Sequence, residues 1–273
     1  MLLACTAVLL AGCSAMQLSY NNADVYLRWR AGQYMDLDVA ASAEFDRRID
    51  RFLTWHRRSA LAQYARLAEE AAGRLANGLS RADLAWGYEV IQAQLREGLR
   101  AAAGEAADLL DSLSPAQLAS LEKRLAKENR DFVRANVLDG TPDERRKKRV
   151  ERNVDRIEDW LGSLSEAQHE IVRLYSARAP LDDRMRYRDR MRLQDEFVAL
   201  LRARQARETL AEWAVNWEMN RDPAYSAGRL QQLQEYFRLL LDLDKTLSSA
   251  QRAHLIRRLQ GYARDFAVLA DAK

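Results

Sequence analysis

The sequence has few of the residues that interrupt helices or build covalent and metal-bound centres. Among its 273 residues are only four prolines, 11 glycines, two cysteines and three histidines. Long stretches that alternate apolar and polar residues, as strands do, are also missing. Ala, Leu, Arg and Glu dominate instead, and the chain is 48% hydrophobic and 30% charged. This composition predicts an all-α protein whose helices have solvated faces.

The same scarcity argues against catalytic and metal sites. His56, His169 and His254 lie far apart, and no histidine or cysteine pair has the spacing of metal ligands. The sequence has no nucleophile-elbow pattern and no glycine-rich phosphate loop. Neighbouring acids such as Glu69 and Glu70 are most simply solvated charges. We therefore expect no metal, no cofactor and no enzymatic activity. Only carboxylates that converge from distant segments would reopen that question.

The first thirteen residues, MLLACTAVLLAGC, have the pattern of an export signal. The apolar run at residues 2–10 is too short to cross a bilayer, which takes roughly 20 apolar residues. It fits the hydrophobic region of a signal peptide, with small residues after it. Only Met1 precedes the run, where a signal peptide normally has basic residues, so we expect the true start to lie upstream. The alternative is the first turn of a buried helix, with Cys13 in the core.

Residues 10–13 read LAGC, which resembles the lipobox of bacterial lipoproteins. In those proteins the cysteine thiol receives a diacylglycerol, and cleavage makes the cysteine the new N-terminus. The resemblance implies that residues 1–12 are a signal peptide and that Cys13 is lipidated. Cys5 would leave with the signal peptide, so no disulfide would remain. Ser14, rather than aspartate, follows the cysteine, which implies the periplasmic face of the outer membrane.

The charge balance agrees with an exported protein. The net charge of +3 is too small to indicate a polyanionic partner, and we expect no contact with nucleic acid. The strongest cluster lies at residues 144–149. It is interpreted as a solvated helix face, or alternatively as a contact with anionic lipid or lipopolysaccharide headgroups. The residues of that contact would be Arg145, Arg146, Lys147 and Lys148.

Apolar periodicity and helix-breaking residues predict an elongated antiparallel bundle, because the connections are short. Pro115, Pro142, Pro180 and Pro223 each mark a helix start, where the missing N–H has no intrahelical acceptor. We expect a lipidated N-terminus with a short helix at 13–40 and a helical domain at 41–273, either undivided or in halves at 41–140 and 141–273. The expected helices are 22–34, 41–76, 80–112, 115–136, 142–162, 165–177, 182–219, 224–244 and 249–269.

An internal repeat is the most specific feature of the sequence. Residues 113–132 and 247–266 are identical at eleven of twenty aligned positions, and residues 164–168 add a partial third copy. This agreement predicts a duplicated helical unit. The shared L-S-x-x-Q pattern is typical of a capping box that starts a helix, and binding of a ligand is the alternative. The motif residues are Leu113, Ser114, Gln117, Leu164, Ser165, Gln168, Leu247, Ser248 and Gln251.

Two resemblances follow from these motifs. L-S-x-x-Q is similar to the LTxxQ motif of Spy and CpxP, which are periplasmic helical proteins of the stress response, and Spy is a chaperone with a concave cradle. Over most of its length the chain resembles a family of uncharacterised proteobacterial lipoproteins. These have a lipobox cysteine, a Y-N-x-A-D stretch, a tryptophan and charged helices. Here the matching residues are Cys13, the YNNAD at residues 20–24 and Trp29.

The six tryptophans have two possible roles, as core residues or as part of a binding groove. Most are expected to anchor helices in the core. Trp213 and Trp217 are four residues apart and therefore share a helix face, with Met219 close by. An exposed version of that face would be a groove for a partner.

Taken with the export signal, these features favour a non-enzymatic envelope lipoprotein that binds or scaffolds a partner. Its contacts would be the membrane, through the N-terminal lipid, and an envelope protein or an unfolded client. The alternative is a membrane-tethered chaperone resembling Spy. An enzyme acting on envelope polymers is the third class. The sequence gives no indication of the oligomeric state.

Overall fold

The computed structural model describes residues 15–34, 38–179, 183–219 and 221–272, and every regular element in these ranges is helical. The all-α prediction is thus confirmed. The elements are α2 (Ala15–Asn21), α3 (Ala23–Tyr34), α4 (Val39–Trp55), a π-helical turn η1 (His56–Ala60), α5 (Leu61–Leu75), α6 (Arg81–Asp111), α7 (Pro115–Ala135), α8 (Pro142–Leu161), α9 (Glu166–Arg178), α10 (Asp183–Arg202), α11 (Ala206–Val215), α12 (Pro223–Asp244) and α13 (Ser249–Asp271).

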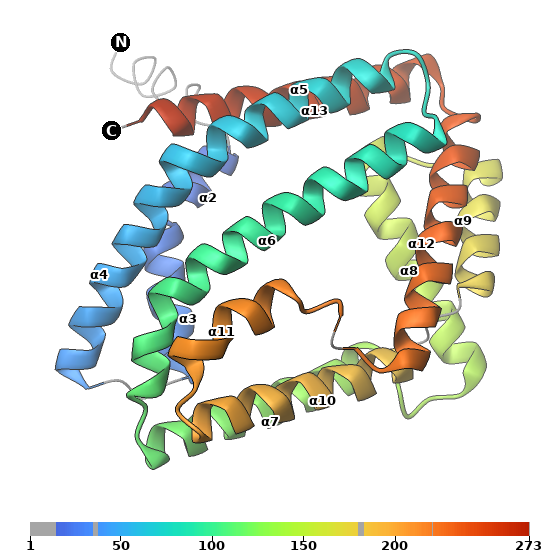
Figure 1. Cartoon of the computed structure of the whole chain (residues 1–273). Helices are drawn as coiled ribbons and strands as arrows, with labels where there is room; N and C mark the ends of the chain where they lie inside the picture. Colours follow the sequence, from blue (N-terminus) through green and yellow to red (C-terminus); the bar gives the residue numbers. More distant parts are fainter. Residues whose placement is uncertain (1–14, 35–37, 180–182, 220, 273) are drawn as a thin grey trace, which may run out of the picture.

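The helices form the sides of an open frame (Figure 1). α5 and α13 run antiparallel along one side, and α7 and α10 do so along the opposite side. α4, with α2 and α3 behind it, makes a third side, while α8, α9 and α12 make the fourth. α6 crosses between them, with α11 packed against it. This layout differs from the elongated bundle that was predicted, because a short connection joins two helix ends without making the helices parallel.

Local capping explains where most helices begin. The side chains of Ser80, Ser114, Thr141, Ser165 and Ser248 each accept a hydrogen bond from the N–H three residues on, and the residue there bonds back. Each such capping box pairs backbone groups that the helix itself leaves without partners. Pro115, Pro142 and Pro223 lie in the first turn of their helices, as predicted. Pro180 lies outside the described residues.

The structure departs from the predicted helices at three places. Helix α2 precedes the first predicted helix, and a π-helical turn interrupts the one predicted at 41–76. The helix predicted at 182–219 is divided, because Arg204 takes a left-handed conformation (φ 54°) at the end of α10. The Asp111 carboxylate then accepts hydrogen bonds from the N–H groups of Ala206 and Arg207, 2.8 and 3.0 Å away, and so caps α11 from a distant part of the chain.

Buried apolar side chains form two separate clusters, and others, such as Leu61 and Leu269, are buried outside both. The first lies among α6, α7, α10 and α11 and includes Leu113, Leu121, Leu201 and Leu210. The second lies among α8, α9 and α12; its buried members are Ile157, Leu161, Val172, Tyr175, Leu239 and Leu243. Neither cluster spans the frame, so the sides of the molecule depend on contacts between neighbouring helices.

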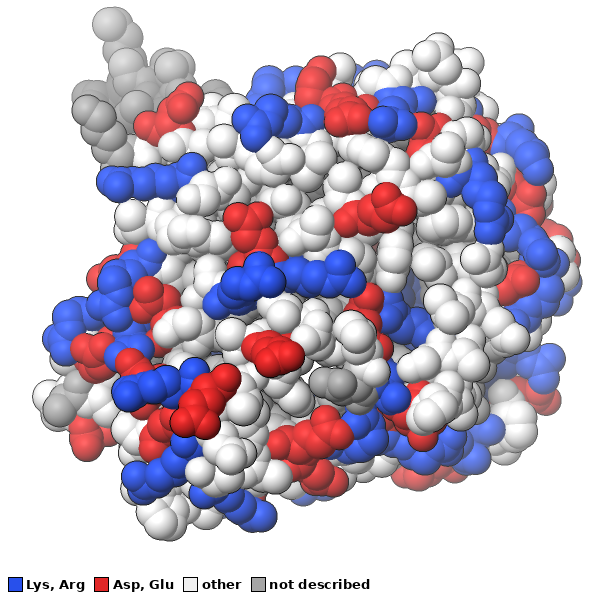
Figure 2. Space-filling model, in the orientation of Figure 1, with Lys and Arg blue, Asp and Glu red and all other residues white. Residues whose placement is uncertain are grey.

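Charged pairs reinforce the joints between helices. Asp183 and Asp189 on α10 are each 4% exposed, and each is paired with an arginine. Arg152 donates to both carboxylate oxygens of Asp183 at 3.1 Å, and Arg221 pairs with Asp189. Buried carboxylates need such partners, since an unpaired buried charge is strongly destabilising. On the surface, acidic and basic side chains intermingle, with no broad area of one sign on the visible face (Figure 2).

The contact between α5 and α13 is the most extensive one between helices, and it generates a test. Leu269 on α13 is 1% exposed, so Leu269→Ala should leave a cavity and lower the free energy of unfolding by about 2–5 kcal/mol. Urea denaturation followed by circular dichroism would measure the change.

The neighbouring Val268 is 54% exposed and provides the control. Val268→Ala should change the free energy of unfolding by less than about 0.5 kcal/mol. Equal losses in both variants would contradict the assignment of this α13 face to the interior.

Candidate functional site

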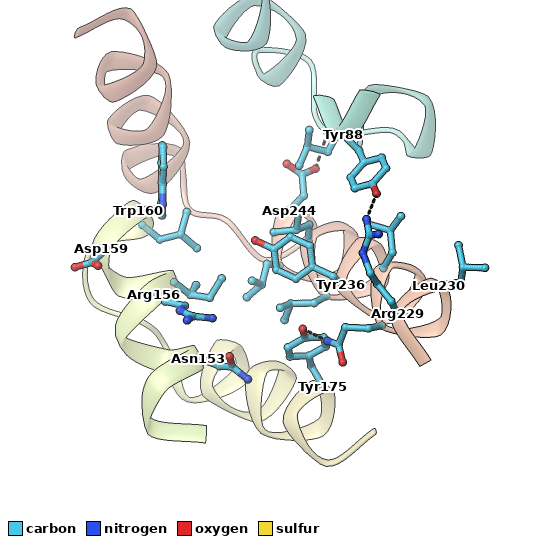
Figure 3. Close-up of a pocket in the computed structure, with 18 of the residues that line it drawn as sticks. Tyr88, Asn153, Arg156, Asp159, Trp160, Tyr175, Arg229, Leu230, Tyr236 and Asp244 are labelled. Carbon is cyan, nitrogen blue, oxygen red and sulfur yellow. Dashed lines mark hydrogen bonds between the residues drawn. The ribbon is translucent and has the colours of Figure 1, made fainter. Parts of the chain in front are cut away.

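A cavity of about 1010 Å³ opens on the side of the frame formed by α8, α9 and α12. The start of α6, the segment after α11 and the start of α13 complete its walls. Figure 3 shows side chains from these elements turned toward a common space. A pocket of this size, with mostly apolar walls and a few polar groups, is typical of a ligand site.

Helical spacing explains how the walls arise. Asn153, Arg156, Ile157 and Trp160 on α8 follow each other at intervals of three, one and three residues and therefore share one face. On α12 the same rule brings a longer stripe to the cavity. The apolar lining consists of Leu79, Ile157, Leu161, Leu230, Leu233, Leu239, Leu240, Leu243, Leu247 and Leu255. One wall is thus the open edge of the second core cluster.

One charged group at the cavity is held in a local network. Arg229 on α12 pairs with Glu218 and donates a hydrogen bond to the Tyr88 hydroxyl. Its guanidinium also lies 5.1 Å from the ring centre of Trp217, and Arg96 lies 3.4 Å from Glu218. Burial raises the pKa of Tyr88, and the charge of Arg229 opposes that shift. These contacts tie α12 to α6 and compensate the charges.

A second charged group closes the corner where α6, α12 and α13 meet. Arg252 donates to the Asp244 carboxylate at 2.9 Å and to the Leu75 carbonyl at 3.0 Å. The other carboxylate oxygen of Asp244 accepts a hydrogen bond from the Leu79 N–H at 3.1 Å. Asp244 is therefore fully engaged in holding the corner.

The polar part of the cavity has a different character. In Figure 3 the guanidinium of Arg156 and the hydroxyl of Tyr236 point into the space, whereas Asp159 points away. Tyr175 accepts a hydrogen bond from Gln232 Nε2. Burial raises the pKa values of Tyr175 and Tyr236, and the charge of Arg156 opposes both shifts. Among the described residues, Arg156 has no ion pair and no hydrogen bond.

The structure brings two of the three L-S-x-x-Q motifs together. Gln168 is 1% exposed, and its Nε2 donates to Gln251 Oε1 at 3.0 Å, while Gln251 Nε2 donates to Gln168 Oε1 at 3.1 Å. Each amide also reaches a loop carbonyl, that of Thr246 or Ser163. Each glutamine still completes its own capping box. The motif residues therefore begin two helices and join them.

The leucines and serines of the motifs have structural positions as well. Leu164 and Leu247 both pack against the second core cluster, and Leu247 also lines the cavity. The third copy lies at the turn between α6 and α7, where Leu113 is buried in the first cluster. There Ser114 and Gln117 form the capping box of α7. Its position is separate from the cavity.

The basic cluster is largely paired within its own helix, α8. Arg146 lies 2.7 Å from Asp143, and Lys148 lies 3.3 Å from Glu151. Arg145 donates to the Gly140 carbonyl, and Lys147 is exposed. Local pairing lowers the charge available to a membrane surface, so the predicted contact of these four residues with anionic headgroups has less support than their sequence alone suggests.

The two late tryptophans do not share a groove. Trp213 stacks on Phe197 with ring centres 5.6 Å apart, against the first core cluster. Trp217 lines the cavity instead, and Arg221 and Arg229 lie over its ring. Met219 is 79% exposed. The end of α11 separates the two rings, because the regular helix stops at residue 215.

Cys13 lies outside the described residues, but the helices that follow it have an exposed apolar face. Leu18 on α2 and Val25, Tyr26 and Trp29 on α3 are between 57% and 64% exposed. On α3, Val25 and Trp29 are four residues apart and therefore share one face. Large apolar side chains grouped on a surface indicate an interaction site.

Sequence patterns did not single out Arg156, Tyr175, Arg229 or Tyr236. Their only signal is the helical spacing that they share with the apolar stripe of their helices. In the described ranges, no group of three or more His, Cys, Asp or Glu residues is placed to hold a metal ion. Nor do those ranges contain a helix that is long and apolar enough to cross a membrane.

The fold defines an all-α protein with an apolar cavity at one side of a helical frame. Residues 33–220 match a family of unknown function, DUF6279, and the chain belongs to this family. The matched region includes α8 and α9 of the cavity and ends before α12 and α13. No curated protein and no solved structure matches the chain significantly.

The glutamine pair generates a prediction. Gln168→Ala removes the buried amide that bonds to the Gln251 side chain, the Thr246 carbonyl and the Ser165 N–H. It should lower the free energy of unfolding by roughly 1–3 kcal/mol. A double-mutant cycle with Gln251→Ala should give a coupling energy above about 0.5 kcal/mol, measured by urea denaturation.

The exposed capping box of α8 provides the control. Glu144→Ala removes the same kind of reciprocal bond at Thr141 without any partner helix. Its loss of stability should be smaller than that of Gln168→Ala. Strictly additive effects of the two glutamine substitutions would show that the amide pair does not couple α9 to α13.

Proposed function

We propose that the chain is a lipid-anchored, non-enzymatic binding protein of the cell envelope, which holds an apolar or amphipathic ligand in the cavity between α8, α9 and α12. The observation that carries the proposal is the cavity itself, about 1010 Å³ with leucine-rich walls and several aromatic rings. Such walls stabilise a ligand chiefly by removing its apolar surface from water.

The state of the charged groups supports binding rather than catalysis. A general acid or base needs a group that is free to exchange a proton with the substrate. In the described part of the chain, three carboxylates line the cavity. Glu218 is paired with Arg229 and Asp244 with Arg252, so these two hold helices together, and Asp159 points away from the space (Figure 3). This arrangement favours a binding role over an enzyme acting on envelope polymers.

The N-terminal segment supports the anchorage. The lipobox pattern that ends at Cys13 is followed after a few residues by the exposed apolar side chains of α2 and α3. Tyr26 and Trp29 have amphipathic rings, which favour the boundary between lipid headgroups and acyl chains. We place this face against the bilayer, and Ser14 favours the periplasmic side of the outer membrane.

Two finer assignments belong to the same proposal. Within DUF6279, the lipobox and the YNNAD stretch favour a relation to the proteobacterial lipoproteins that the chain resembles. The repeat favours an ancestral duplication of one helical unit. The positions of α7 and α13 support this duplication. Both helices start with the same kind of capping box, and they run antiparallel to α10 and α5, respectively.

A membrane-tethered chaperone resembling Spy is the second candidate. The observation that favours it is the exposure of Leu230 (67%) and Tyr236 (42%) at the cavity, because accessible apolar groups can hold an unfolded segment. Suppression of the aggregation of a denatured client at equimolar ratio would favour this candidate. No suppression at a stoichiometric excess would remove it.

Uptake of a neutral apolar dye tests the cavity. N-phenyl-1-naphthylamine should bind the unlipidated Cys13→Ser chain with increased fluorescence. Leu240→Trp, which fills the cavity from α12, should weaken binding at least tenfold. The same ring placed at Ile91, which is 66% exposed on α6, should leave binding within twofold. Equal binding by both tryptophan variants would place the dye elsewhere.

Metabolic labelling tests the anchorage. Cells that express the wild-type chain with its natural leader should incorporate a labelled fatty acid into the protein, and cells that express Cys13→Ser should not, because the thiol is the site of acylation. Membrane fractionation should move the variant to the soluble fraction. Equal labelling of the two chains would refute the lipoprotein assignment and leave the cavity test unaffected.

A further inference from the structure

Some charged side chains around the cavity have an ion-pair partner and others do not. Glu218 and Asp244 each face an arginine within ion-pair distance. Arg156 has no such partner among the described residues, and the carboxylate of Asp159, which also lines the cavity, is turned away from Arg156 (Figure 3). Arg186 on α10 also lines the cavity, and its nearest carboxylate, that of Asp183, is 4.0 Å away and already bound by Arg152. One part of the cavity therefore has excess positive charge.

Hydrogen-bond donors surround this charge. The Tyr236 hydroxyl makes no hydrogen bond with another described residue. Tyr175 accepts from Gln232 and keeps its own proton free to donate. Arg156 adds a planar set of N–H donors that matches two oxygens of a carboxylate or phosphate. The chemistry of this part suits an anionic group with several acceptor oxygens.

The rest of the cavity has the opposite character. Leu243, Leu247 and Leu255 line it, and Trp160 closes one side (Figure 3). An inorganic anion would leave these walls in contact with water. A purely apolar ligand would leave Arg156 and the tyrosine hydroxyls without acceptors, and a cation would be repelled by Arg156 and Arg186.

We propose that the ligand is an anionic amphiphile: an acyl chain that lies along the leucines, with a carboxylate or phosphate headgroup bound by Arg156 and Tyr236. This inference rests on the proposed function, since it names the ligand class for the same cavity. Arg186, which lines the same cavity and whose charge acts on Tyr175 as that of Arg156 does, strengthens the field that attracts the headgroup.

Displacement of the bound naphthylamine dye from the full Cys13→Ser chain tests the inference. Four competitors with a sixteen-carbon chain differ only in the headgroup: palmitate, 1-palmitoyl lysophosphatidic acid, 1-palmitoylglycerol and hexadecyltrimethylammonium. All are used below their critical micelle concentrations. The two anions should displace the dye at least tenfold more tightly than the neutral glyceride, and the cation should be weakest. Preference for palmitate or for the phosphate distinguishes a free fatty acid from a phospholipid.

Substitution of the headgroup residues locates the effect. Arg156→Gln should weaken displacement by the preferred anion tenfold or more and leave the neutral glyceride within twofold. Arg156→Lys should restore part of the loss, and Tyr236→Phe should weaken the anion about threefold. Arg238→Gln, which removes an exposed arginine of α12 outside the cavity, is the matched control. Thermal midpoints of all variants should agree, because Arg156, Tyr236 and Arg238 are all exposed.

The outcomes separate the two proposals. If the dye binds but the glyceride competes as well as the anions, and Arg156→Gln has no effect, the anionic ligand is wrong and the binding function stands. If neither dye nor amphiphile binds, both proposals fall. If Arg238→Gln weakens the anions as much as Arg156→Gln does, the selectivity comes from surface charge and the headgroup site is refuted.

Discussion

The position of α13 is the constraint on which the rest of the fold depends. This last helix lies antiparallel to α5, contacts α2 and α8, and reaches α9 through Gln251. It therefore joins the beginning of the described chain to its end and closes the frame (Figure 1). Leu255 of the same helix lines the cavity. Loss of this packing would open the frame and remove a wall of the ligand site at once.

The frame itself follows from how the apolar residues are distributed. Helices with such a high charge content present narrow apolar stripes, and each stripe can cover only one or two neighbours. Two small clusters result, and buried pairs such as Arg152 with Asp183 hold the joints between them. The cavity lies where the stripe of α12 is wider than the helices beside it can cover. An apolar surface of that kind is stabilised by whatever removes it from water.

The sequence predicts those helix starts whose contacts lie within a few residues of one another. It does not predict features that depend on contacts between distant segments. Capping boxes and prolines locate the starts of α7, α8 and α13, because both partners of each bond lie within one turn. The start of α11 is not predictable in this way, since its cap is Asp111 from α6. The break before it depends on Arg204 in a conformation that glycine usually takes. For the same reason the cavity was not predicted: Arg156 and Tyr236 have no motif and meet only in the folded chain.

The relation between anchor and cavity limits how a ligand could reach the site. α2 and α3, which follow the lipobox, lie on the opposite side of the frame from α8, α9 and α12 (Figure 1). α6 crosses between these sides, and its 31 residues extend for about 46 Å. With α2 and α3 on the bilayer, the cavity would face the aqueous space, away from the headgroups. An amphiphile bound there must then have left its membrane. This arrangement is expected of a protein that carries or accepts free amphiphiles, and not of one that acts on lipids within the bilayer.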